Sequence, residues 1–141
     1  MQFSIHGEVA FTRLGQILVA DVQGPWNAEL IELYKAQMTP YVAEMAKTGP
    51  WGLILVVHNE AACPPDAIEG IRRGVIEQAK NWHRVCTSYV IAPDVLGYRV
   101  MDRVWLNIYR DVIPCEIFEQ REDALAWTEL QLAAAKKSAA L

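Results

Sequence analysis

The chain has 141 residues, of which 52% are hydrophobic and 21% are charged, and its formal net charge at pH 7 is −4. This size and composition suit one globular domain with a filled core, and they exclude a disordered chain. Phosphate backbones repel an acidic surface, so the charge argues against nucleic acid as a partner, and no uncharged apolar run approaches the roughly 18 residues that cross a bilayer.

Cysteine usage and the first residues bear on the cellular compartment. Cys63, Cys86 and Cys115 are odd in number, are widely spaced and form no CxxC motif. They indicate reduced thiols rather than a disulfide framework or a zinc site. The opening MQFSIHGEV has no basic segment followed by an apolar stretch, so we expect no signal peptide and a cytoplasmic protein.

The opening of the chain predicts a hairpin. QFSIH (2–6) and EVAFTR (8–13) are short strand-like segments, and Leu14 and Gly15 turn the chain into QILVADV (16–22), which is rich in β-branched residues. Gly24 and Pro25 end this run. We expect the hairpin to add an antiparallel strand to the sheet that follows.

A helix follows, for which Asn27 is a suitable N-cap. Apolar residues spaced three and four apart define its inward face: Leu30, Leu33, Tyr34, Met38, Tyr41 and Met45. Pro40 cannot donate a hydrogen bond to the carbonyl of Ala36, but the apolar spacing continues across it. We therefore expect a kink at Pro40 rather than a break.

GLILVV (52–57) is apolar on both faces of any strand, which is typical of the centre of a parallel sheet covered by helices. Pro64 and Pro65 open the next helix, where their missing N–H groups cost little. The inward stripe of this helix is predicted to be Ile68, Ile71, Val75 and Ala79.

The last part of the chain repeats the alternation of strand and helix. The predicted elements are a strand at VCTSYVIA (85–92), a helix over 95–109, a short strand at PCEIF (114–118) and a final helix at QREDALAWTELQL (120–132). The order ββαβαβαβα predicts an α/β domain over 1–132, with a mostly parallel sheet, an antiparallel N-terminal strand and flanking helices. We expect 133–141 to be a frayed tail.

Two stripes run along the predicted helix over 95–109. One stripe is expected to face the sheet: Gly97, Val100, Met101, Val104 and Ile108. A second lies about 110° around the helix and contains Tyr98, Asp102, Trp105 and Tyr109. Because Tyr and Trp are frequent interface anchors, the second stripe is either the margin of the core or a contact surface. A contact surface would most simply form a symmetric homodimer.

The junction from His58 to Asp66 is the main candidate site. Cys63 precedes a helix start, and His58 is five residues away, which is compatible with a cysteine-dependent enzyme or a redox sensor. Glu60 and Asp66 surround Cys63 with negative charge, however, and oppose thiolate formation. The three histidines of the chain have no recognised ligand spacing, so we expect neither a metal nor a cofactor.

Several features together resemble one family. The order of elements, the length, the GPW before the first helix, the PWGLILVV strand and the closing CEIFEQREDALAW are similar to the SpoIIAA-like branch of the STAS domains. The resemblance covers nearly the whole chain. It implies a cytoplasmic, non-enzymatic domain that binds a partner protein or a small ligand.

The resemblance also implies where a regulatory residue would lie. In STAS antagonists the loop after the central strand carries a serine or threonine that a partner kinase phosphorylates, and the added charge breaks docking. This chain has HNEAACPPDAIEG there, and no serine or threonine occurs between Thr48 and Thr87. We therefore expect no phosphorylation switch at this place.

The sequence favours a non-enzymatic binding or regulatory domain that engages a partner protein or a second copy of itself. The predicted binding residues are His58, Asn59, Glu60, Cys63, Asp66, Tyr98, Trp105 and Tyr109. One alternative is a site for a small apolar ligand between helices and sheet, enclosed by Trp26, Trp51 and Tyr98. The second alternative is chemistry at Cys63.

Overall fold

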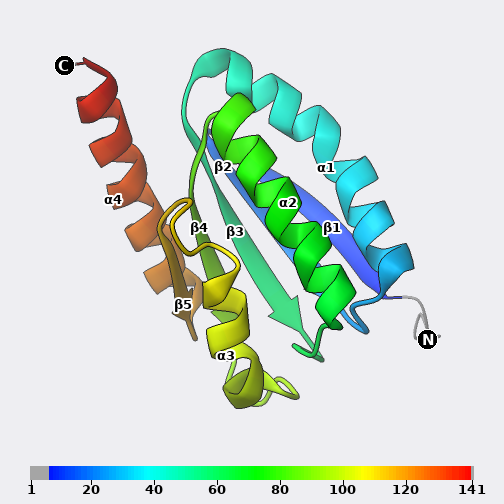
Figure 1. The fold of residues 1–141 in the computed structure, drawn as a ribbon. Helices are drawn as coiled ribbons and strands as arrows, with labels where there is room; N and C mark the ends of the chain where they lie inside the picture. Colours follow the sequence, from blue (N-terminus) through cyan, green and yellow to red (C-terminus); the bar gives the residue numbers. More distant parts are fainter. Residues whose placement is uncertain (1–6, 141) are drawn as a thin grey trace.

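The computed structural model describes residues 7–140, with side chains as far as residue 138. Within these residues the elements follow the predicted order ββαβαβαβα (Figure 1). They are β1 Glu8–Leu14, β2 Ile17–Gln23, α1 Ala28–Thr48, β3 Trp51–His58, α2 Pro65–Asn81, β4 Arg84–Ile91, α3 Tyr98–Asn107, β5 Cys115–Phe118 and α4 Arg121–Ala140. The strand-like segment predicted over 2–6 lies outside the described residues.

The strands form one mixed sheet in the order β1-β2-β3-β4-β5. β1 pairs with β2 in antiparallel fashion around Gly15, whose φ of +62° suits a tight turn. The pairs β2–β3, β3–β4 and β4–β5 are all parallel. The predicted α/β class with a mostly parallel sheet and an antiparallel N-terminal strand is confirmed.

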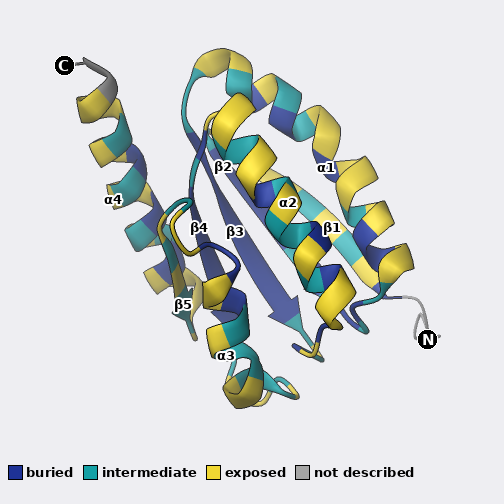
Figure 2. Ribbon diagram, in the orientation of Figure 1, coloured by how far each residue is buried: buried dark blue, intermediate teal, exposed yellow. Residues whose placement is uncertain are grey.

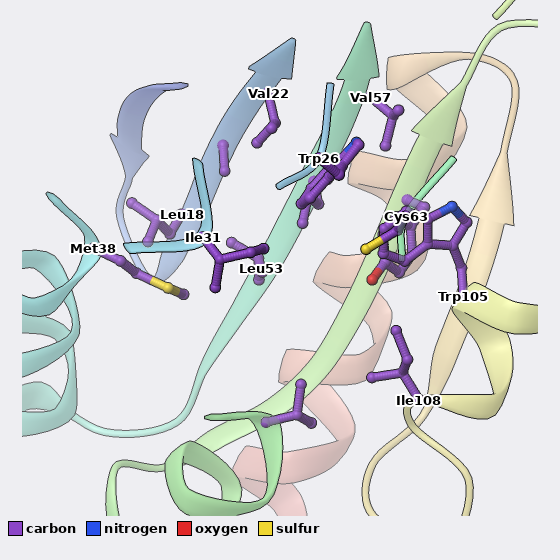
Figure 3. Close-up of a cluster of buried hydrophobic side chains, with 14 of the residues drawn as sticks. Leu18, Val22, Trp26, Ile31, Met38, Leu53, Val57, Cys63, Trp105 and Ile108 are labelled. Carbon is purple, nitrogen blue, oxygen red and sulfur yellow. The ribbon is translucent and has the colours of Figure 1, made fainter. Parts of the chain in front are cut away.

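Helices cover both faces of the sheet. The larger core joins side chains of α1, α2 and α3 to one face of the sheet, and Figure 3 shows part of it, including Leu53, Val57 and Ile108. The smaller core joins α4 to the opposite face through residues such as Ile54, Val90 and Ala124. In Figure 1, α4 accordingly lies on the side of the sheet away from α1 and α2.

β3 is the interior strand that its sequence predicts. Every residue from Trp51 to Val57 is buried, as the uniform dark blue of this strand in Figure 2 shows. Gly52 faces α4, and a Cβ atom there would lie 2.7 Å from the Sγ atom of Cys86 and 2.9 Å from a carbon of Thr128. Glycine at this position therefore allows α4 to pack closely against the sheet.

α1 begins as its sequence predicts and passes through Pro40 without a break. The Oδ1 atom of Asn27 accepts a hydrogen bond of 2.9 Å from the backbone N–H of Leu30. Figure 1 shows the helix axis bending along its length, which agrees with the expected kink. Met38 and Met45 are buried as predicted, whereas Leu33 is exposed.

α2 begins at Pro65 with Pro64 as its N-cap. Its buried residues are Ala67, Gly70 and Val75, while Ile68 and Ile71 pack at the margin of the core. Val75 is therefore buried as predicted, but the small residues Ala67 and Gly70 take the buried positions expected for Ile68 and Ile71.

The predicted orientation of α3 is right for Ile108, which is buried in the larger core, but wrong for Val100 on the same stripe. Val100, placed against the sheet by the sequence pattern, is 80% exposed, whereas Trp105 is 0% and Tyr109 only 2% exposed. Trp105 lies in the larger core near Cys63 in Figure 3. The aromatic stripe therefore belongs to the core, because large rings bury more apolar area than the aliphatic residues that compete for the same face.

α4 continues through 133–140, where we expected a frayed tail. Leu132, directly before this segment, is buried in the smaller core, and its packing holds the adjoining part of the helix against the sheet. Among residues 7–140, no helix combines the length and the apolarity that crossing a membrane requires.

Replacing Trp105 tests its place in the core. We expect Trp105→Ala to lower the free energy of unfolding by about 3–5 kcal/mol, because it opens a cavity. Trp105→Phe should cost less than half as much, because it keeps a ring and removes an indole N–H that has no acceptor. Urea denaturation measures both, with Leu106→Ala on the same helix as the control. A Trp105→Ala variant as stable as the control would contradict the burial of Trp105.

Candidate functional site

The parallel strands β3 and β4 end beside a cleft. Its volume is about 470 Å³, and it lies between the carboxyl ends of these strands and the start of α4. The polar residues that line it are His58, Asn59, Asp94, Glu119, Gln120, Arg121 and Glu122. Ligands of open α/β sheets characteristically bind outside the carboxyl ends of the strands, so this cleft is the first candidate site.

A three-residue network crosses this edge of the sheet. The Oδ1 atom of Asp21 lies 2.7 Å from Nε2 of His58 and 2.5 Å from Nη2 of Arg121. These residues come from β2, the end of β3 and the start of α4 respectively. His58 also borders a second cleft of about 150 Å³ with Asp21 and Glu8. The network therefore separates two hollows and holds the start of α4 against the sheet.

The charge of the larger cleft is negative. Asp94, Glu119 and Glu122 line it, and Arg121 is the cationic side chain beside them. The described residues contain no group of three His, Cys, Asp or Glu side chains that could hold a metal ion. Carboxylates therefore outnumber cationic side chains in the lining of this cleft.

Two loops meet beside the cleft and expose apolar side chains. Asn59 has a φ of 70°, a left-handed conformation that asparagine tolerates well. Its carbonyl accepts a hydrogen bond of 3.1 Å from the N–H of Leu96, and the carbonyl of Leu96 accepts one of 2.8 Å from Ala61. Leu96 is 70% exposed and Val100, one turn on, is 80% exposed. Two apolar side chains therefore project into solvent close to an acidic cleft.

The structure places the predicted binding residues in different surroundings. His58 and Asn59 line the cleft, and Glu60 pairs through its backbone with Leu96. Asp66 is exposed in the first turn of α2 and does not line this cleft.

The remaining predicted residues are core residues or lie at its margin. Cys63, Trp105 and Tyr109 are buried, and Tyr98 packs against the core from its margin. A contact surface through Trp105 and Tyr109 is therefore wrong for this chain. The rings are in contact instead with core partners, and Tyr89 lies between them, with ring centroids 5.3 Å from Trp105 and 5.9 Å from Tyr109.

Cys63 is poorly suited to nucleophilic chemistry. Burial raises the pKa of its thiol to about 12, and the negative charge of Asp66 adds to the effect. Burial likewise raises the pKa of Cys86 to about 11 and that of Cys115 further. A thiol in this state carries little thiolate at neutral pH, which argues against the cysteine alternative.

The apolar ligand site expected between Trp26, Trp51 and Tyr98 is not formed. Trp51 is the first residue of β3, whereas the indole N–H of Trp26 donates to the carbonyl of Glu60, beyond the end of that strand. The two indoles therefore lie at opposite ends of β3 and cannot enclose one ligand. Each is buried among core side chains instead.

Asp21 and Arg121 are the site residues that the sequence analysis missed. Asp21 is the single charged residue in the apolar segment QILVADV, and Arg121 opens the last helix. An acid in such a strand indicates a partner nearby, but nothing in the sequence identifies a partner 100 positions away. Comparisons with protein-family models, with curated proteins and with solved structures give no match to this chain.

Thiol labelling tests the state of Cys63. We expect iodoacetamide to label Cys63 about a thousandfold more slowly at neutral pH than a free thiol, because its raised pKa leaves so little thiolate. The rate should rise continuously as the pH increases above 9. Peptide mapping by mass spectrometry measures the rate, and the chain in denaturant provides the control. Fast labelling of the folded protein near pH 7 would contradict this assignment.

Proposed function

We propose that this domain functions by binding a partner protein at the edge where β3 and β4 end, and not by catalysis. The observation that carries the proposal is the acidic cleft beside the exposed side chains of Leu96 and Val100. Protein interfaces commonly combine apolar contacts with polar and charged groups beside them. The resemblance to the SpoIIAA-like branch of the STAS domains supports the same conclusion, because those domains act through partners.

The chemistry of the edge specifies the kind of partner. Three carboxylates of the cleft favour Lys or Arg side chains, and the nearby apolar residues favour a hydrophobic anchor on the same segment. A symmetric homodimer through this edge would place each acidic cleft against its own copy. Like charges facing each other oppose association, so a different protein with a basic segment suits the edge better than a second copy.

The proposed binding does not depend on phosphorylation of the loop after β3. This loop and the start of α2 contain no serine or threonine. Asp66 occupies the first turn of α2, where a carboxylate interacts favourably with the helix dipole. Asp66 therefore carries its negative charge without a kinase, and phosphorylation of this loop does not control the proposed binding of a partner.

Charge reversal at the cleft tests the proposal. We expect a double Glu119→Lys, Glu122→Lys variant and a Val100→Asp variant to lose partners that the wild-type domain captures from its own cells. Calorimetry with an identified partner should then show binding weakened by about tenfold for each reversed charge, and less at high salt. The matched controls are Glu129→Lys and Leu130→Asp on the exposed side of α4, which should bind like the wild type.

Two results would contradict this proposal. Capture of the same proteins by the cleft variants and by the controls would exclude the edge as the binding surface. A doubled mass in light scattering, returned to the monomer mass by Val100→Asp, would assign the edge to a second copy of the chain instead.

A further inference from the structure

Arg84 is a buried cation at the other end of the sheet. It is the first residue of β4, and only 4% of it is exposed. Its guanidinium lies over two aromatic rings, 5.9 Å from the ring centre of Trp51 and 5.5 Å from that of Tyr109. Arginine keeps its charge in proteins, so the sheet encloses a full positive charge here.

The hydrogen bonds of Arg84 all end on neutral acceptors. Its Nε and Nη2 atoms donate to the hydroxyl of Thr87 at 3.1 and 2.7 Å, and Nη2 also donates to the hydroxyl of Tyr109 at 3.0 Å. Nη1 donates to Oε1 of Gln78 at 3.0 Å. Among the described residues, no carboxylate forms an ion pair with Arg84. An isolated buried charge is costly, so an anion at this place would be stabilising.

Nearby tyrosines do not supply that negative charge. Burial raises the pKa of Tyr34, of Tyr89 and of Tyr109 above its ordinary value of 10.0, although Arg84 lowers the pKa of Tyr34 and Tyr109 in part. All three side chains are therefore neutral phenols near pH 7. The positive charge of Arg84 is left without a protein counter-ion in the described part of the chain.

A cavity lies next to Arg84, between α1 and α2. Its volume is about 40 Å³, and its walls include Tyr34 and Lys35 of α1, Gln78 of α2 and the side chains of Arg84 and Tyr109. One liquid water takes up roughly 30 Å³, so the space suits one small ion or the head of a larger molecule.

A wider groove lies beside this cavity and is lined by the same two helices. It has a volume of about 250 Å³, shares Gln78 with the cavity and is lined further by Val42, Ala43 and Trp82. Gln78 therefore borders both hollows, and α1 and α2, which line them, lie next to each other over one face of the sheet in Figure 1.

Two glycines of α2 contribute to the open space. Gly70 and Gly74 lie one turn apart and line the cavity, yet a Cβ atom added to either would meet no atom within 4 Å. Glycine inside a helix costs about 1 kcal/mol relative to alanine, and no close neighbour requires it here. The missing side chains leave room over Arg84 that the protein itself does not fill.

We propose that the cavity between α1 and α2 binds a small monovalent anion, a halide or the carboxylate head of an organic acid, against the guanidinium of Arg84. Arg84 and Lys35 both line this cavity, so its positive charge favours an anion, and its small volume limits the occupant to a small ion or a carboxylate head. The groove beyond Gln78 accommodates a short apolar tail on such an acid. This site is separate from the partner-binding edge, and neither proposal depends on the other.

Thermal unfolding in different sodium salts tests the proposal. The probes are chloride, formate and butyrate, each added at constant ionic strength against gluconate, which is too large for the cavity. We expect a saturable rise in Tm with at least one probe, because a ligand that binds only the folded state stabilises it. A response to chloride alone identifies a halide site, and a response to formate and butyrate identifies a carboxylate site. Equal Tm values in all four salts would overturn the proposal.

Two variants test whether the anion-dependent rise in Tm comes from this cavity. Arg84→Met removes the charge and keeps much of the length, and Gly74→Leu fills the space while leaving Arg84 in place. Both should lose the anion-dependent rise in Tm, whereas Ala36→Leu, on the exposed side of α1, should keep it. If Arg84→Met does not fold, Gly74→Leu still decides. A full anion response in Gly74→Leu would show that the cavity is not the site.

Discussion

Parallel pairing of β3 with a strand on each side is the constraint on which the rest of the structure depends. Hydrogen bonds to β2 and β4 leave β3 without a free edge, and helices cover both of its faces. A strand in this position must be apolar along its whole length. Parallel pairing also aligns all the carboxyl ends at one edge of the sheet and all the amino ends of β2 to β5 at the other.

The two ends of the parallel strands have different chemistry for this reason. At the carboxyl ends the chain enters loops, and polar side chains from β2, β3 and α4 meet in the network of Asp21, His58 and Arg121. At the amino ends, Arg84 and Trp51 lie within the core, where the indole N–H of Trp51 donates to the carbonyl of Trp82 at 2.6 Å. One end is therefore polar and lined by carboxylates, and the other end encloses a cation among aromatic rings.

A row of aromatic rings joins these two regions through the core. Trp26 packs against Trp105 with ring centroids 5.0 Å apart, and Tyr89 and Tyr109 continue the row to the guanidinium of Arg84. Rings packed in this way hold α3 against the sheet and fix the distance between the cleft and the buried cation. Trp105 of α3 and Tyr109, which follows the helix, thus belong to the core and not to the surface.

The sequence by itself determined the order of the elements, the interior position of β3, the cap at Asn27 and the start of α2 at its prolines. These features depend on local spacing and on residues close together in the chain, so periodicity and capping rules were sufficient. Even two of the residues that line the cleft, His58 and Asn59, follow from their place directly after a buried strand.

Only the tertiary structure decided which face of α3 is buried, that Asp21 meets Arg121, and that Arg84 is buried beside a cavity between α1 and α2. The two stripes of α3 are both apolar enough to pack, so the choice depends on Trp26 and Tyr89, which other elements supply. Pairs far apart in the chain and the space left between two helices are set by how the elements pack together. No local pattern of residues contains that information.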